Sequence, residues 1–164
     1  MTIEEYYQEA IENPLVRQAF IDSLDLSSIT PYTRSVRYSK KPRMKDNMAT
    51  FHPFINLRFI FPRKSKIVVY PSSFQIDTHQ TAQDFLSTLI DHEGYHAMRH
   101  FTGARPPSPN VMDPGGCVVH DMEEELRVYQ YQVNNFATRG VSEHYRNRML
   151  ESIGNIESFL KQYK

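Results

Sequence analysis

The spacing of hydrophobic positions predicts helices at both ends of the chain and strands between them. Over residues 2–12 the apolar side chains recur at helical spacing, and Thr2 with Glu5 forms a capping-box pattern. A second helix is predicted over residues 14–25, with Asn13 as its N-cap and a proline in the first turn. We expect the N-terminal segment 1–25 to supply packing helices without a direct role in chemistry.

The middle of the chain, residues 27–71, has the pattern of a strand-rich segment. β-branched and aromatic residues recur with polar ones between them in three runs: residues 27–39, 51–61 and 66–70. Residues 40–50 are basic and polar, which indicates a solvated turn. The short link at residues 63–65 predicts that the last two runs form a hairpin. We therefore expect a small antiparallel or mixed sheet of three or four strands.

The remaining segment, residues 78–164, is predicted to be helical apart from one loop. Apolar residues at helical spacing predict three helices, over residues 78–100, 121–140 and 142–163. Residues 101–119 are rich in glycine and proline and predict a loop. A loop of that length is often a lid or the wall of a cleft.

The order of these elements predicts one α+β domain over residues 1–164, with the sheet packed against helices. A hydrophobic fraction of 40% is ordinary for a soluble globular protein. Lys+Arg and Asp+Glu both number 19, so there is no basic excess to hold a nucleic-acid backbone. The single cysteine excludes an internal disulfide, and no apolar run is long enough to span a membrane. We expect a cytoplasmic protein; the sequence does not determine its oligomeric state.

An HExxH motif, His92-Glu93-x-x-His96, lies in the helix predicted over residues 78–100. Two histidines four residues apart project from one helix face with Cβ atoms about 5–6 Å apart, a span that one zinc ion can bridge. Glu93 does not share that direction and can instead take a proton from metal-bound water. Gly94 weakens the helix by roughly 1 kcal/mol and either leaves room near the metal or is simply tolerated.

Catalytic zinc usually has three protein ligands and one open position, so a third ligand is expected. In metzincins this ligand is a histidine six residues after the second, preceded by a glycine. Here Thr102 and Arg99 occupy those positions, which excludes that class. The helix predicted after the loop offers three adjacent acids instead: Glu123, Glu124 and Glu125.

Helical geometry distinguishes these acids without deciding between them. Glu125 shares a stripe with Tyr129, which is expected to face the motif helix, whereas Glu124 points about 100° away. Glu123 is less favourable than either, and most of the acidic run suits the positive end of a helix. His120 is a second-rank alternative ligand. A Cys117 thiolate could also bind zinc, although an inert cysteine is the simpler interpretation.

The chain at this point resembles the gluzincin-type zinc metallopeptidases, the thermolysin-like group, and in particular its small bacterial members. Glu125-Leu-Arg-Val-Tyr129 followed by Gln132 is similar to their second motif, with Val128 in place of the usual small residue. The resemblance covers roughly residues 50–140. It implies a zincin-like fold and a Zn²⁺-dependent peptidase that acts on a peptide or protein. It also implies the roles of the residues, namely metal ligands His92, His96 and Glu125 and general base Glu93.

The sequence does not identify the sheet edge that would bind a substrate or the donor that would stabilise the oxyanion. A sheet edge beside the metal could pair with an extended peptide, and residues 66–70 are one candidate for that edge. A Tyr or His donor could stabilise the oxyanion, and the candidates are Tyr95, His120 and Tyr129.

Other functions are compatible with the motif. The domain could retain the metal site as a non-catalytic regulatory or interaction module. A di-iron helix bundle would need a second ExxH motif, which the chain lacks, and the strand-rich middle also opposes it.

Overall fold

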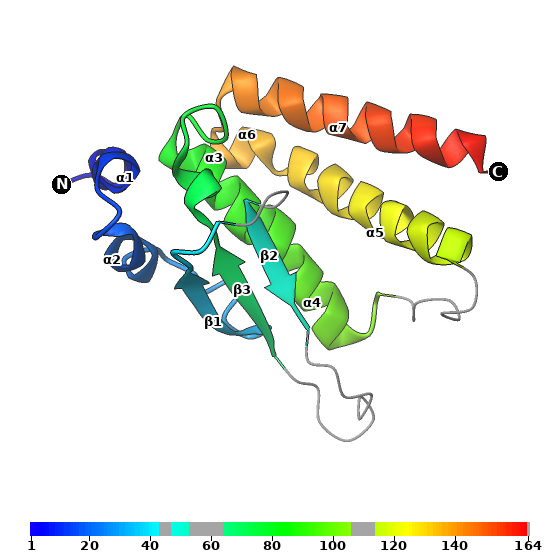
Figure 1. Cartoon of the computed structure of the whole chain (residues 1–164), viewed down its shortest axis with the longest axis horizontal. Helices are drawn as coiled ribbons and strands as arrows, with labels where there is room; N and C mark the ends of the chain where they lie inside the picture. Colours follow the sequence, from blue (N-terminus) through cyan, green and yellow to red (C-terminus); the bar gives the residue numbers. More distant parts are fainter. Residues whose placement is uncertain (43–46, 53–63, 106–113, 164) are drawn as a thin grey trace.

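The computed structural model describes residues 1–42, 47–52, 64–105 and 114–163, with only the backbone described for residues 114–117. It has an α+β fold, mostly helical with one small sheet, as the hydrophobic pattern predicts (Figure 1). The strands are β1 (Thr33–Tyr38), β2 (Met48–Phe51) and β3 (Ser65–Val69). The helices are α1 (Ile3–Glu12), α2 (Arg17–Asp22), η1 (Pro71–Phe74), α3 (Ala82–Leu86), η2 (Ser87–Glu93), α4 (Gly94–Thr102), α5 (Pro114–Asn134), α6 (Phe136–Arg139) and α7 (Glu143–Gln162).

The sheet is mixed, with strand order β1-β3-β2. β1 runs parallel to β3 and β2 runs antiparallel to it, so Ile67 in β3 lies between Val36 and Thr50. The predicted run at residues 66–70 is therefore the central strand and not a sheet edge. β2 is the edge strand of the sheet that lies beside the long helix with the HExxH motif (Figure 1).

One prediction about the middle segment is wrong, and another is confirmed only in part. β2 begins at Met48, inside the region predicted to be a turn, because Met48 is buried and pairs with Val69 at the core side of the sheet. The predicted hairpin is present in part: β2 and β3 are antiparallel neighbours with Phe51 opposite Lys66, but the link between them is longer than predicted, because β2 ends at Phe51 and Ser65 already belongs to β3. The rest of the predicted strand at residues 51–61 lies almost wholly outside the described residues.

The two N-terminal helices cover one end of the sheet. α1 has the predicted capping box, in which Thr2 and Glu5 exchange hydrogen bonds of 2.6 and 3.2 Å. α2 is shorter than predicted and begins only at Arg17, because the Arg17 side chain binds the carbonyls of residues 10 and 11 and Leu15 is 83% exposed. Aromatic side chains from these helices, η1 and α3 form the centre of the core: Tyr7, Phe20, Phe74 and Phe85.

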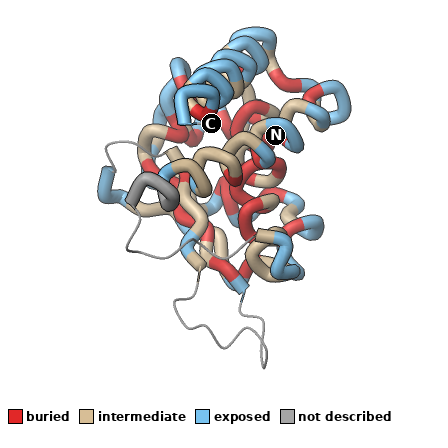
Figure 2. The backbone as a smooth tube through the Cα atoms, turned by 90° about the vertical axis from the view of Figure 1, so that its right-hand side faces the viewer, coloured by how far each residue is buried: buried red, intermediate tan, exposed pale blue. Residues whose placement is uncertain are grey.

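A long helix from Ala82 to Thr102, made of α3, η2 and α4, runs through the molecule between the sheet and the C-terminal helices (Figure 1). Thr81 and Asp84 cap its start reciprocally. Its middle section, η2, has π-helical hydrogen bonds, which are rare and are found frequently at functional sites. The interior of the molecule consists largely of buried residues (Figure 2), and the helix with the motif runs through it. The motif therefore lies on a firmly packed element.

Gly94 allows this helix to approach the segment before β1. A Cβ atom at position 94 would lie 2.3 Å from Cγ2 of Ile29, which is itself only 3% exposed. The glycine therefore makes room for a core side chain rather than for the metal. We expect Gly94→Ala to lower the free energy of unfolding by about 1–3 kcal/mol through overpacking. Chemical denaturation measures this, and Gly154→Ala in α7 is the control, because a Cβ there meets nothing within 4 Å.

The predicted loop at residues 101–119 is shorter at both ends than expected. α4 continues to Thr102 and is closed by Gly103, whose φ of 75° suits glycine. α5 begins at Pro114, because a proline in the first turn is compatible with a helix even when two glycines follow it. Residues 106–113, and with them the proposed lid, lie outside the described residues, as does the Cys117 side chain.

The C-terminal helices stack beside the long helix. α5 and α7 lie side by side and run in opposite directions (Figure 1). Gly140 ends α6 with a φ of 71°, at the predicted end of the helix over residues 121–140, and Ser142 caps α7. None of the helices in the described part of the chain is both long and apolar enough to cross a membrane.

Candidate metal centre

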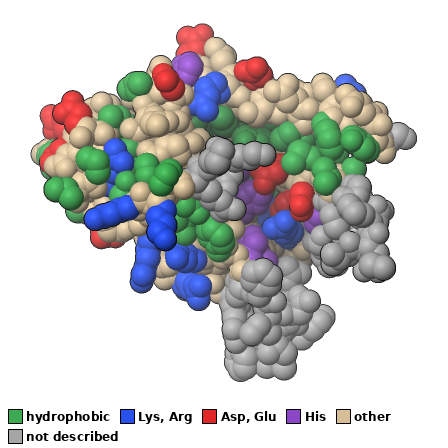
Figure 3. Space-filling model, viewed as in Figure 1, with side chains coloured by type: hydrophobic (Ala, Val, Ile, Leu, Met, Phe, Trp, Pro, Cys, Tyr) green, Lys and Arg blue, Asp and Glu red, His purple; other side chains and the backbone are tan. Residues whose placement is uncertain are grey.

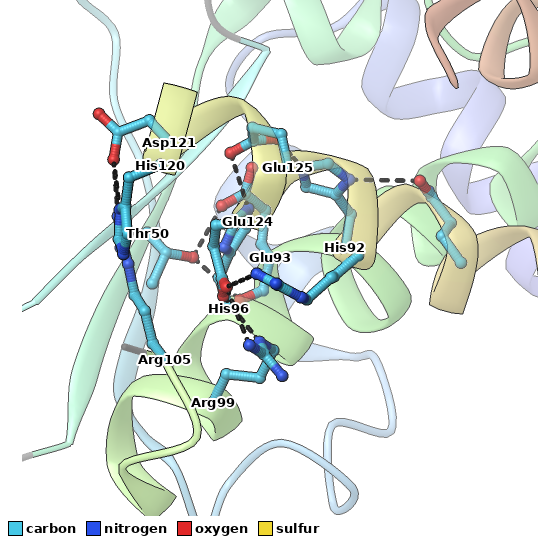
Figure 4. Close-up of polar contacts among 12 residues, drawn as sticks. Thr50, His92, Glu93, His96, Arg99, Arg105, His120, Asp121, Glu124 and Glu125 are labelled. Atoms are coloured by element: carbon cyan, nitrogen blue, oxygen red, sulfur yellow. Dashed lines mark hydrogen bonds and ion pairs between the residues drawn. The ribbon is translucent and has the colours of Figure 1, made fainter. Parts of the chain in front are cut away.

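Side chains from two helices converge on one point between α4 and α5. His92 and His96 project from the long helix, and Glu125 reaches them from α5 (Figure 4). Nε2 of His92 lies 3.4 Å from one carboxylate oxygen of Glu125, and Nε2 of His96 lies 3.1 Å from the other. One ligand atom from each residue lies within 4.8 Å of the others, so a single cation could be held by all three.

The chemistry of this cluster fits a divalent metal. Two imidazole nitrogens and one carboxylate oxygen are a donor set that catalytic zinc uses, with a fourth position left open. Burial tends to raise the pKa of Glu125, but hydrogen bonds from His92 and His96 outweigh it and hold that pKa well below its usual range. Burial tends to lower the pKa of His92, and the carboxylates of Glu125 and Glu93 raise it overall. The carboxylate is therefore ionised, as a metal ligand must be.

Glu124 is engaged elsewhere. Arg99 donates two hydrogen bonds to its carboxylate, of 2.7 and 2.9 Å, and the side chain of Glu124 is only 1% exposed. Arg99 is the residue that stands at the glycine position of the metzincin pattern. The structure thus brings Glu125 and not Glu124 to the two histidines, while Glu123 is absent from the metal-ligand cluster found among the described residues.

Glu93 lies beside the cluster without joining it. Its carboxylate accepts a 2.7 Å hydrogen bond from the hydroxyl of Thr50, which lies on the edge strand β2 (Figure 4). The same hydroxyl lies 3.0 Å from the Glu93 carbonyl oxygen. Strand β2 therefore fixes the carboxylate that the motif predicts as general base.

The cluster opens into a cavity of about 450 Å³. On the face shown in Figure 3, histidine and acidic side chains gather near the middle of the molecule. β2 forms one wall through Ala49 and Thr50, and α5 and α7 form another through Tyr129 and Tyr145. Arg105 lies at the rim of the same cavity and contacts Asp121 at 3.4 Å.

The three candidate oxyanion donors lie in different places. Tyr129 lines the cavity, with its ring 4.7 Å from that of His92, and burial raises its pKa to about 12, so its hydroxyl keeps its proton. Tyr95 stacks on Tyr131 at 3.8 Å and is not among the cavity-lining residues. Both ring nitrogens of His120 are buried without a hydrogen-bond partner in the described part of the chain, and Nδ1 lies 3.6 Å from Asp121.

Several residues that shape this site were not predicted to do so. Thr50 falls in the segment predicted as a turn. Tyr145 of α7 lines the cavity, although the sequence predicts no candidate site residue in the helix over residues 142–163. Gln132 is completely buried and its Oε1 lies 3.3 Å from Nδ1 of His92. The local signal for Gln132 is its position seven residues after Glu125, which places both on one helix face.

Comparison of the chain with models of known protein families, with curated protein sequences and with solved structures finds no match.

Proposed function

We propose that the protein is a zinc-dependent peptidase with a zincin-like, gluzincin-type site. The observation that supports it best is the convergence of His92, His96 and Glu125 at the wall of a cavity that also contains Glu93. In this proposal the first three residues hold the metal and the fourth is the general base. The spacing of the two histidines alone would not support it, because a carboxylate from a distant helix has to complete the set.

A bound Zn²⁺ ion would supply a Lewis acid that polarises the substrate carbonyl and makes water more acidic. Glu93 accepts the proton of the attacking water and passes it to the leaving amine. Its carboxylate is held for this by Thr50 at 2.7 Å. Tyr129 is the candidate for stabilising the oxyanion, since it lines the cavity and its raised pKa keeps the hydroxyl as a donor.

The substrate in this proposal is an extended peptide segment. β2 is an edge strand and its residues Met48 to Phe51 all line the cavity. A peptide in extended conformation could pair with such an edge, which would carry its scissile carbonyl past the metal cluster. The edge strand thereby takes the role for which residues 66–70 were a candidate from the sequence.

Metal content and peptide hydrolysis of the purified protein test this function together. We expect one zinc ion per chain and cleavage of an unfolded protein substrate that stops after chelation and returns when zinc is added back. Zinc binding without cleavage of varied peptides would instead favour the non-catalytic metal-binding module. A protein that binds no zinc would overturn both functions.

A further inference from the structure

Two arginine side chains line the cavity beside the metal cluster, Arg105 after α4 and Arg148 in α7. Arg105 pairs with the carboxylate of Asp121 at 3.4 Å. Arg148 is held differently, because its Nη1 donates hydrogen bonds of 2.6 and 2.8 Å to the main-chain carbonyls of Asp77 and Thr78. Within the described part of the chain no carboxylate forms an ion pair with Arg148. The two carbonyls fix the guanidinium in place but carry no charge that would neutralise it.

The remaining donors of Arg148 suit a carboxylate. Both of its hydrogen bonds to described residues leave from Nη1, so Nε and Nη2 have no acceptor among those residues. These two nitrogens lie on one edge of the planar guanidinium and can donate in parallel to the two oxygens of a carboxylate. Because the side chain is already anchored, a ligand would cost little further ordering of it. Arg148 therefore presents a preformed carboxylate site to the cavity.

Arg148 lies at the end of the cavity where β2 begins. Its two carbonyl acceptors directly precede His79, whose Nδ1 lies 2.8 Å from the carbonyl oxygen of Ser73. The Ser73 hydroxyl in turn donates a hydrogen bond to the carbonyl of Asn47, the residue before β2. Thr50, which binds the proposed general base, lies farther along the same strand. The arginine is therefore displaced from the point of cleavage toward the start of β2.

Tyr129 lies between this arginine and the metal cluster. The Tyr129 ring lies 4.7 Å from that of His92. Burial raises the pKa of Tyr129 to about 12, and the positive charge of Arg148 acts against that rise, which places the guanidinium near the phenol. Tyr129 comes one helical turn after Glu125, which is about 6 Å along the axis of α5. A peptide in extended conformation spans that distance in about two residues.

We propose that Arg148 binds a carboxylate of the substrate within about two residues after the scissile bond. The inference rests on the proposed peptidase function and narrows its substrates to peptides with a carboxylate at that place. Antiparallel strand pairs outnumber parallel ones about two- to three-fold. A peptide paired antiparallel to β2 directs its C-terminal part toward the start of that strand, where Arg148 lies. The carboxylate is either the C-terminus of the peptide or the side chain of an acidic residue.

Cleavage of a peptide mixture, prepared once with free and once with amidated C-termini, tests this substrate class. We expect mass spectrometry of the products to place the cleaved bonds one or two residues before a carboxylate. If the C-terminus is the ligand, amidation should lower kcat/KM about 10–100-fold, as expected for a lost charge-assisted hydrogen bond. If an acidic side chain is the ligand, amidation has no effect and replacing that acid by its amide causes the same loss. Cleavage that depends on neither carboxylate would overturn the proposal.

Arg148→Met should abolish the preference for a carboxylate and lower kcat/KM on the preferred peptide about 10–100-fold. Arg146→Met is the matched control, because Arg146 lies two residues away in α7, is exposed and is not among the cavity-lining residues. It should cleave like the wild type. Both variants should keep their zinc affinity, since neither arginine belongs to the metal cluster. A carboxylate preference that persists in Arg148→Met would contradict the proposed role of this arginine.

A binding measurement without turnover separates this inference from the proposed function. The side-chain Nε–H signal of Arg148, assigned by its absence in Arg148→Met, is followed in Glu93→Gln protein during titration with acetyl-alanyl-alanine. We expect the signal to shift with this free acid and not with its C-terminal amide. A signal that responds to both or to neither would overturn the inference, even if the wild type cleaves peptides. A response to the acid alone would support the Arg148 site, even if a wild type that cleaves nothing overturned the proposed function.

Discussion

Replacing Glu93 with Gln is expected to abolish peptide hydrolysis while leaving zinc bound. The amide keeps the size of the side chain and can still bind the Thr50 hydroxyl, which contacts Glu93 at 2.7 Å. It cannot accept a proton, and general-base catalysis contributes about 10²–10⁴-fold in rate. We therefore expect kcat to fall by about that factor, measured by peptide cleavage alongside zinc content.

Asp91→Asn is the control for this prediction. Asp91 is a buried carboxylate two residues before Glu93 on the same helix, but it pairs with Arg139 at 2.8 and 3.0 Å and is absent from the cavity lining. Its loss should reduce stability and leave the kcat of the folded protein unchanged. A Glu93→Gln variant that cleaves at the wild-type rate would remove Glu93 from the proposed mechanism.

Replacing Glu125 with Ala is expected to weaken zinc binding by more than about 100-fold. Residues that only orient a ligand typically cost 10–100-fold in metal affinity, so the loss of a ligand should cost more. The carboxylate is also the only group in the cluster with negative charge at neutral pH, and it lies 3.1 Å from His96 and 3.4 Å from His92. Competition with a chromogenic chelator measures the dissociation constant.

Glu124→Gln is the control for the Glu125→Ala prediction. Glu124 is one residue away in the same helix but is bound by Arg99, so Glu124→Gln should destabilise the fold without affecting zinc affinity. Breaking a buried charge pair costs about 3–5 kcal/mol, which a denaturation curve resolves. If Glu124→Gln lost zinc while Glu125→Ala retained it, the ligand set would have to be reassigned.

Local sequence patterns predict much of the secondary structure of this protein. The capping box at Thr2 and the helix end at Gly140 are short-range features, fixed by residues three or four positions apart. The α+β class follows in the same way from the change in hydrophobic period. Errors occur where a long-range contact prevails: β2 forms at Met48 because β3 pairs with it.

The candidate site likewise has features that the local sequence predicts and features that depend on long-range contacts. The pairing of His92 with His96 depends on one helical turn and is visible in the sequence. The choice of Glu125 over Glu124 depends on how α5 is rotated against the long helix, and it is set by the pair between Glu124 and Arg99, 25 residues apart. The role of Tyr145 in the cavity wall depends on α7 lying beside α5, which no local pattern reveals.

The most direct measurement of the central claim is the X-ray absorption spectrum of the purified protein at the zinc edge. The proposed site predicts a four-coordinate zinc with two imidazole nitrogens at about 2.0–2.1 Å and oxygen ligands at about 2.0–2.2 Å. The signal of the second imidazole should disappear in His96→Ala. A spectrum with sulfur in the first shell, or one unchanged by His96→Ala, would contradict a metal held by His92, His96 and Glu125.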